Sequence, residues 1–100
     1  MDNIRRSQRK PLLVDVEYES AGVRVKARIN NIGTLGVFIE TGSPLQVGVH
    51  LRLRFTMPSG RIIEAEGVVA HRQTGSGMGI AFISTGAEEA EHIRQFIDAE

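Results

Sequence analysis

Alternation of apolar and polar residues constrains this chain more than any other feature, because it recurs through most of the sequence. Two segments have an apolar residue at every second position: Val23, Val25, Ala27 and Ile29, and then Val49, Leu51, Leu53 and Phe55. Successive side chains of a strand point to opposite faces, so a period of two predicts strands with one buried face. The chain is therefore predicted to be built mainly from antiparallel strands.

Six strands are expected, separated by turns that contain glycine or proline. Their predicted ranges are 12–19, 23–30, 37–39, 49–56, 61–72 and 78–83. Gly67 falls in the middle of the fifth strand, where a glycine indicates a bulge or a sharp bend. Short strands with turns about every eight to twelve residues are typical of a small barrel or a sandwich.

The last segment has the spacing of a helix. Its apolar residues form a narrow stripe: Ala90, Ile93, Phe96 and Ile97. The preceding Thr85-Gly86-Ala87-Glu88 fits a capping box. We therefore predict a single all-β domain with a flexible basic arm over residues 1–10, a barrel or sandwich over 12–84, and a helix over 86–99 that covers an open part of the sheet.

Composition narrows the classes of function. The chain has 100 residues and no cysteine, which predicts one domain without disulfides or a sulfur metal site. Its formal net charge is zero, which argues against bulk attraction to nucleic acid or anionic lipid. No apolar run is long enough to cross a membrane, so a cytoplasmic protein without membrane insertion is expected.

Basic charge is nevertheless concentrated at the N-terminus, where Arg5, Arg6, Arg9 and Lys10 accompany a single acid, Asp2. Guanidinium groups match phosphate oxygens bidentately and stack on purine rings. An extended arm rises roughly 3.3 Å per residue, so Arg5 and Arg9 would lie about 13 Å apart and reach both sides of a dinucleotide. The residues alone leave a second interpretation open, in which the arm is a solvated terminus that binds nothing.

The stretch Asn30-Asn31-Ile32-Gly33-Thr34-Leu35-Gly36, between two predicted strands, is a second candidate feature. Its two neighbouring amides supply donors and acceptors on short stems. Its glycines tolerate positive φ or a close approach to the backbone. This composition predicts a tight corner that can serve as a ligand platform.

Three motifs of the chain resemble those of the PilZ family: Arg5-x-x-x-Arg9 before the first strand, Asn31-x-Gly33-x-x-Gly36 after the second, and Gly77-x-Gly79-x-x-Phe82 in the last. The resemblance covers nearly the whole chain. It implies a six-stranded antiparallel Greek-key or split β-barrel with a C-terminal helix. It also implies a bacterial receptor for the second messenger cyclic di-GMP. From the motif order and the local charge, we further expect that the N-terminal arm becomes ordered on binding and that the protein signals to an unidentified partner protein.

The resemblance places the ligand on residues of these motifs and one basic neighbour: Arg5, Arg6, Arg9, Asn31, Gly33, Gly36 and Gly79. Arg5 and Arg9 would grip phosphate and stack on guanine, while Asn31 would read a guanine edge. Gly33 departs from the family pattern, which has serine there. Losing one neutral hydrogen bond costs about 0.5–1.5 kcal/mol, or roughly three- to tenfold in affinity. The departure supports an alternative, a degenerate interaction module that no longer binds the nucleotide.

No catalytic motif is apparent, so neither an enzyme nor a cofactor is expected. The three histidines, His50, His71 and His92, are scattered and lack paired carboxylates, which makes a metal site unexpected. Each of them is expected to face solvent. The neighbouring pair His71-Arg72 leaves another interpretation open, in which it lies beside the ligand.

Basic side chains also share strand faces in two segments: Arg24, Lys26 and Arg28, and then Arg52 and Arg54. They allow a third interpretation, a small barrel that binds single-stranded nucleic acid. Few aromatic residues remain outside the predicted core to stack on bases. We therefore expect solvated faces and no DNA or RNA partner.

Overall fold

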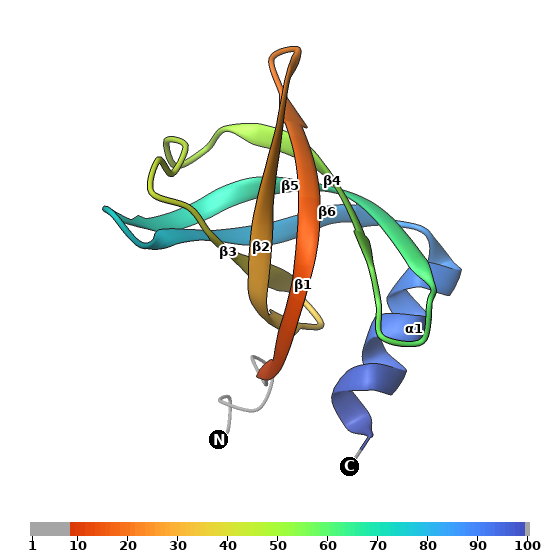
Figure 1. Ribbon diagram of the computed structural model, residues 1–100. Coiled ribbons are helices and arrows are strands. Elements are labelled where there is room, and N and C mark those ends of the chain that lie inside the picture. Colours follow the sequence, from red (N-terminus) through yellow and green to blue (C-terminus); the bar gives the residue numbers. More distant parts are fainter. Residues whose placement is uncertain (1–8, 100) are drawn as a thin grey trace, which may run out of the picture.

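The computed structural model describes residues 9–99 as six antiparallel strands closed into a barrel, with one helix packed at an end of it (Figure 1). The elements are β1 (Arg9–Ser20), β2 (Val23–Gly33), β3 (Gly36–Glu40), β4 (His50–Thr56), β5 (Ile62–Gln73), β6 (Gly77–Thr85) and α1 (Ala87–Asp98). Around the barrel the order is β1-β2-β3-β6-β5-β4, and pairing of β4 with β1 closes it. The predicted all-β fold with six antiparallel strands and a C-terminal helix is confirmed.

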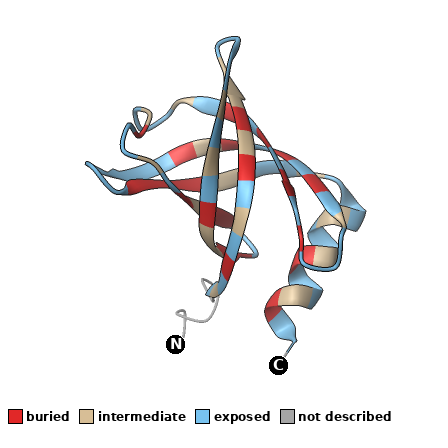
Figure 2. Cartoon of the chain, viewed as in Figure 1, coloured by how far each residue is buried: buried red, intermediate tan, exposed pale blue. Residues whose placement is uncertain are grey.

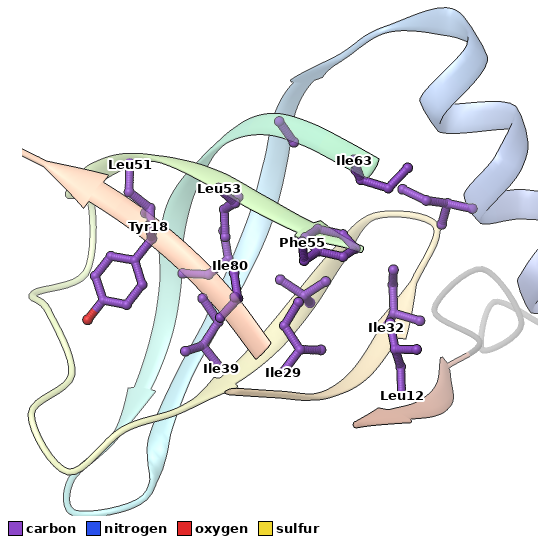
Figure 3. Close-up of a cluster of buried hydrophobic side chains, with 14 of the residues drawn as sticks. Leu12, Tyr18, Ile29, Ile32, Ile39, Leu51, Leu53, Phe55, Ile63 and Ile80 are labelled. Atoms are coloured by element: carbon purple, nitrogen blue, oxygen red, sulfur yellow. The ribbon is translucent and has the colours of Figure 1, made fainter. Parts of the chain in front are cut away.

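The core is made by the inward residues of the strands together with two helix residues, and buried and exposed positions alternate along the strands (Figure 2). Figure 3 shows strand residues such as Phe55 and Ile80 meeting inside the barrel, with Ile63 beside the helix. Ile93 and Ile97 of α1 join this cluster, so the helix closes one end of the barrel with its apolar face. Each fully buried aliphatic side chain contributes roughly 1.5–3 kcal/mol, which is why the alternation dictates the fold.

Two strand boundaries differ from the expected ones. Strand β1 begins at Arg9, so Arg9 and Lys10 belong to the barrel and not to the arm predicted over residues 1–10. Strand β2 continues to Gly33, which leaves only the two residues 34–35 as the corner before β3. The reason is that Arg9 and Lys10 pair with the end of β2. This pairing joins residues far apart in the chain, so the pattern of residues near Arg9 does not predict it.

The helix begins differently from the prediction. Thr85 is the last residue of β6, Gly86 is the N-cap, and no side chain caps the helix, so the predicted capping box is wrong. At the other end, the Lys10 ammonium donates to the carbonyls of Phe96 and Ala99, at 2.8 Å each. The same ammonium lies 4.6 Å from the centre of the Phe96 ring. A cation is favourable at a helix C-terminus, so Lys10 fixes the end of α1 to the start of β1.

Gly67 interrupts the β5–β6 ladder as predicted, since the register shifts between Glu66 and Gly67. A Cβ at this position would lie 2.9 Å from the carbonyl oxygen of Ala81, so the strands could not pack as closely with any other residue. In the described part of the chain, no helix combines the length and apolar character needed to cross a membrane.

Candidate ligand-binding groove

Two strand irregularities coincide at Asn30. In the β1–β2 ladder, Pro11 pairs with Asn31 and Val14 with Ile29, so two residues of β1 stand opposite Asn30 alone. In the β2–β3 ladder, Ile29 pairs with Ile39 and Asn31 with Phe38, so Asn30 has no partner there. Bulges of this kind re-aim side chains and are common next to functional sites.

The consequence is that Asn30 and Asn31 point the same way. Ile29 and Ile32 are both fully buried, and the two residues between them are only partly buried. The Asn31 amide nitrogen donates to the Asn30 side-chain oxygen at 2.6 Å. Strict alternation would place Asn31 on the inner face with Ile29, and the bulge overturns that expectation by turning Asn31 outward beside Asn30.

Arg9 reaches this pair from the neighbouring strand. Its Nε donates to the Asn31 side-chain oxygen at 2.5 Å, and its Nη2 lies 3.5 Å from the carbonyl oxygen of Gly36. Burial lowers the pKa of the Arg9 guanidinium, which nevertheless stays charged at neutral pH because arginine side chains remain protonated in proteins. The Asn30 amide in turn donates to the Glu40 carboxylate at 3.1 Å.

A groove of about 940 Å³ runs from these polar groups across the outer surfaces of β3, β6 and β5. This volume is within the usual range for ligand pockets. Four of the predicted site residues line it: Arg9, Asn31, Gly36 and Gly79. Gly33 is buried opposite Arg9 in the ladder and is not one of the described lining residues. Arg5 and Arg6 lie outside the described residues.

Gly36 is required by close approach and not by an unusual backbone angle. A Cβ there would collide with the carbonyl oxygen of Ile80, because β3 and β6 meet tightly at this point. Leu35, just before it, accepts a backbone hydrogen bond from Phe82 at 2.8 Å. Gly36 therefore closes the barrel at the position where the groove begins.

Two more glycines make room for aromatic rings beside β6, and one of them, Gly79, lines the groove. A Cβ on Gly77 would lie 2.6 Å from the edge of the Phe38 ring, and one on Gly79 would run into the His71 ring. The centroids of the two rings are 6.2 Å apart, and their planes are tilted by 32°. The missing side chains thus allow two aromatic rings to lie against β6 in a surface suited to a flat ligand.

Sequence reasoning missed several lining residues. Glu40 and Phe38 were not singled out. His71 is exposed, as expected, and its ring also lies against Gly79 in the lining of the groove. The pairing of His71 with Gly79 could have been found by aligning the fifth strand with the glycine-rich sixth. His50 is exposed, as expected, and His92 is hydrogen-bonded to the Ser59 hydroxyl at 2.8 Å.

Metal binding finds no support in the part of the chain that the structure describes, which holds no group of three or more His, Cys, Asp or Glu side chains placed to share an ion. The groove instead offers a guanidinium, two amides and two aromatic rings. These groups can bind phosphate oxygens, the edge of a base and the face of a base respectively.

The family model of the PilZ domain matches residues 3–99, so the chain belongs to the PilZ domain family. No curated protein matches it. Among solved structures, the chain is similar to the Bacillus subtilis inhibitor of motility MotI/DgrA, with a TM-score of 0.82 and 21% identity. That match covers 97% of this chain and 50% of the Bacillus protein, so the chain spans half the length of that relative.

Two further neighbours were solved with cyclic di-GMP. The PilZ domain of YcgR from Escherichia coli has a TM-score of 0.76 and 14% identity, over 95% of this chain and 89% of the other. PlzA from Borreliella burgdorferi has a TM-score of 0.64 and 18% identity, over 98% of this chain and 38% of the other. At these identities the neighbours establish the shared fold.

Proposed function

We propose that this PilZ domain is a receptor that binds cyclic di-GMP in the groove of Arg9 and Asn31, orders its N-terminal arm on binding, and signals to a partner protein. Membership of the family and the ligand present in two structural neighbours support the choice of nucleotide. The single observation that carries the proposal is the contact between the Arg9 guanidinium and the Asn31 amide at one end of a groove of ligand size.

Each group in the groove has a role that follows from its chemistry. The planar Arg9 guanidinium can bind two oxygens of a phosphate and can stack on a purine. Asn31 can form hydrogen bonds with the edge of a base. Phe38 and His71 offer their ring faces to a second base. Arg9 donates a hydrogen bond to Asn31, so turning its guanidinium to a phosphate would exchange this internal hydrogen bond for contacts with the nucleotide.

Arg5 and Arg6 are proposed to join the ligand from the arm. They would supply the phosphate contacts that Arg9 alone cannot make, since one charged hydrogen bond contributes roughly 1.5–3 kcal/mol. That the protein is a cytoplasmic receptor rather than an enzyme or a nucleic-acid binder stays a prediction.

The experiment is calorimetric titration of the protein with cyclic di-GMP. The double variant Arg5→Ala/Arg9→Ala should lose binding, because it removes the two guanidiniums that are proposed to bind the phosphates. Its matched control is Arg52→Ala/Arg54→Ala, which removes the same charge from the strand β4 and should keep the affinity within about twofold, as expected for exposed charges. Equal heats from the wild type and Arg5→Ala/Arg9→Ala would remove the site assignment.

The second candidate function is a degenerate interaction module without a nucleotide, and Gly33 is the observation in its favour. Serine at this position in the family pattern could supply a hydroxyl that this chain lacks. Gly33→Ser should raise the affinity for cyclic di-GMP roughly three- to tenfold if the groove binds it. A wild type and a Gly33→Ser variant that both give no heat would favour the interaction module.

A further inference from the structure

Four side chains of the groove are joined by three hydrogen bonds in series. Arg9 donates to the Asn31 oxygen at 2.5 Å, the Asn31 nitrogen donates to the Asn30 oxygen at 2.6 Å, and the Asn30 nitrogen donates to Glu40 at 3.1 Å. The series exists only because the double bulge turns Asn30 and Asn31 to the same side. It therefore links the predicted ligand-binding residues to Glu40, which no motif singled out.

The two ends of the series fix its direction. A guanidinium can only donate hydrogen bonds, and an ionised carboxylate can only accept them. Asn30 must therefore turn its nitrogen to Glu40 and its oxygen to Asn31. Asn31 must then turn its nitrogen to Asn30, so that its oxygen faces Arg9. The orientation of both amides follows from the chemistry of their neighbours, without reference to a ligand.

Ligand binding would release the Asn31 amide from one of the two groups that fix its orientation, Arg9. Arg9 is the residue proposed to turn to the phosphate, and when it does, it no longer holds the Asn31 oxygen. Glu40, acting through Asn30, is then the group that keeps the Asn31 amide in one orientation. Glu40 itself is exposed at the end of β3, and its negative charge beside the groove opposes an anionic ligand. Attraction of the ligand is therefore not its role.

We infer that Glu40 is a positioning residue that gives the groove its choice of guanine over adenine, an inference that rests on the proposed function. An Asn amide offers one acceptor beside one donor. Guanine carries an acceptor at O6 beside a donor at N1, whereas adenine carries a donor at N6 beside an acceptor at N1. The two bases thus present opposite orders, and an amide held in one orientation pairs with only one of them. A freely rotating amide would accept both.

The test compares the affinities of cyclic di-GMP and cyclic di-AMP by calorimetry, and the measured quantity is their ratio. Glu40→Gln keeps an acceptor for Asn30 and should preserve the wild-type ratio within about twofold. Glu40→Lys replaces the acceptor with a donor, so Asn30 turns over and Asn31 loses its fixed orientation. The ratio should fall about tenfold, which corresponds to roughly 1.4 kcal/mol of discrimination. Added positive charge would strengthen the binding of both nucleotides and leave their ratio unchanged.

A second substitution should rescue the first. In Asn30→Asp/Glu40→Lys, the new carboxylate at position 30 accepts from the lysine on one side and from Asn31 on the other, so Asn31 regains its orientation. The ratio should return to within about twofold of the wild type. A Glu40→Lys variant with the wild-type ratio would overturn the inference, as would a double variant no better than Glu40→Lys.

The side-chain amide signals of Asn30 and Asn31 in nuclear magnetic resonance spectra give a readout without ligand. Both pairs should shift in Glu40→Lys, and the Asn31 pair should return towards the wild-type positions in the double variant. If the wild type binds cyclic di-GMP but every variant keeps the ratio, the positioning role fails and the proposed receptor stands. If the wild type binds neither nucleotide, both fail.

Discussion

Two polar surfaces of this barrel show how differently charge can be used on one fold. On the first, which we call the charged face, the outward side chains alternate in sign from strand to strand: basic on β2 (Arg24, Lys26, Arg28), acidic on β1 (Asp15, Glu17, Glu19), basic on β4 (Arg52, Arg54) and acidic on β5 (Glu64, Glu66). The register sets each basic residue opposite an acid. Arg54, for example, pairs with Glu17 on one side and Glu64 on the other.

The groove is the second surface, and its polar groups are arranged by another rule. It has bulged strands, glycines that admit rings or a neighbouring backbone, and a hydrogen-bonded series that runs from Arg9 to Glu40. The charged face has exposed ion pairs at 3.4–3.9 Å, each contributing at most about 1 kcal/mol. The difference teaches that a count of charges does not locate the groove on this barrel, whereas interruptions of the regular strand pairing do.

The charged face also bears on the interpretation in which basic strand faces bind single-stranded nucleic acid, although the absence of a DNA or RNA partner stays a prediction. Arg24, Lys26 and Arg28 were interpreted as a solvated basic face because aromatic residues were scarce. The structure adds a stronger reason, since their neighbours across the ladder are Glu19, Glu17 and Asp15. Stripes of opposite sign cancel within a few ångströms, so they present no extended positive field to a phosphate backbone.

Gly36→Ala should have the largest effect, on stability. Its Cβ would collide with the backbone of Ile80, which cannot move without separating β3 from β6. We expect a loss of about 3 kcal/mol, the upper end of the usual cost of overpacking, and a fall in Tm of more than about 10 °C. Gly42→Ala is the control, because its Cβ would meet nothing within 4 Å. Urea denaturation of both variants measures the difference, and equal midpoints would contradict the close approach.

Lys10→Met should have the second-largest effect, also on stability. The substitution removes two hydrogen bonds to the end of α1 and a cation over Phe96. The expected loss is about 1–2 kcal/mol. Lys26→Met, on the charged face, should cost less than about 0.5 kcal/mol, as is usual for surface changes. If thermal denaturation finds the same loss in both, Lys10 is not a structural link between the groove edge and the helix.

Gly79→Ala should change binding rather than stability. The new methyl group displaces the His71 ring, which is exposed enough to swing away at little cost in folding free energy. The floor of the groove is lost, and the affinity for cyclic di-GMP should fall about fivefold, or roughly 1 kcal/mol. Calorimetry with Gly42→Ala as the control checks this. An unchanged affinity would show that the aromatic floor is not part of the binding surface.

Arg54→Glu should have the smallest effect, about 0.5 kcal/mol of stability. It puts three carboxylates in one row with Glu17 and Glu64. Because Arg54 and Glu64 are exposed and Glu17 is only half-buried, 1 M salt should remove most of the loss, as the Debye length is then only about 3 Å. Urea denaturation at low and high salt measures this loss of stability. A loss that persists at high salt would mean that salt does not screen the repulsion between the three carboxylates.

The sequence by itself determined the strands, the helix and several residues of the groove. Period-two alternation places Leu51, Leu53 and Phe55 inside whatever the strands enclose, because burial of one face leaves no other arrangement. The spacing of the arginine, asparagine and glycine motifs pointed to Arg9, Asn31, Gly36 and Gly79, which all line one groove. Local periodicity and motif spacing carry this information because both can be read along the chain.

Only the tertiary structure decided what surrounds those residues. Asn31 leaves its expected inner face because β1 and β3 each pair with β2 out of step at the preceding residue, Asn30. That coincidence brings Glu40 into the hydrogen-bonded series. Bulges and registers are properties of several strands at once, and their energies depend on contacts between residues far apart in the chain. A pattern confined to one strand therefore cannot specify them.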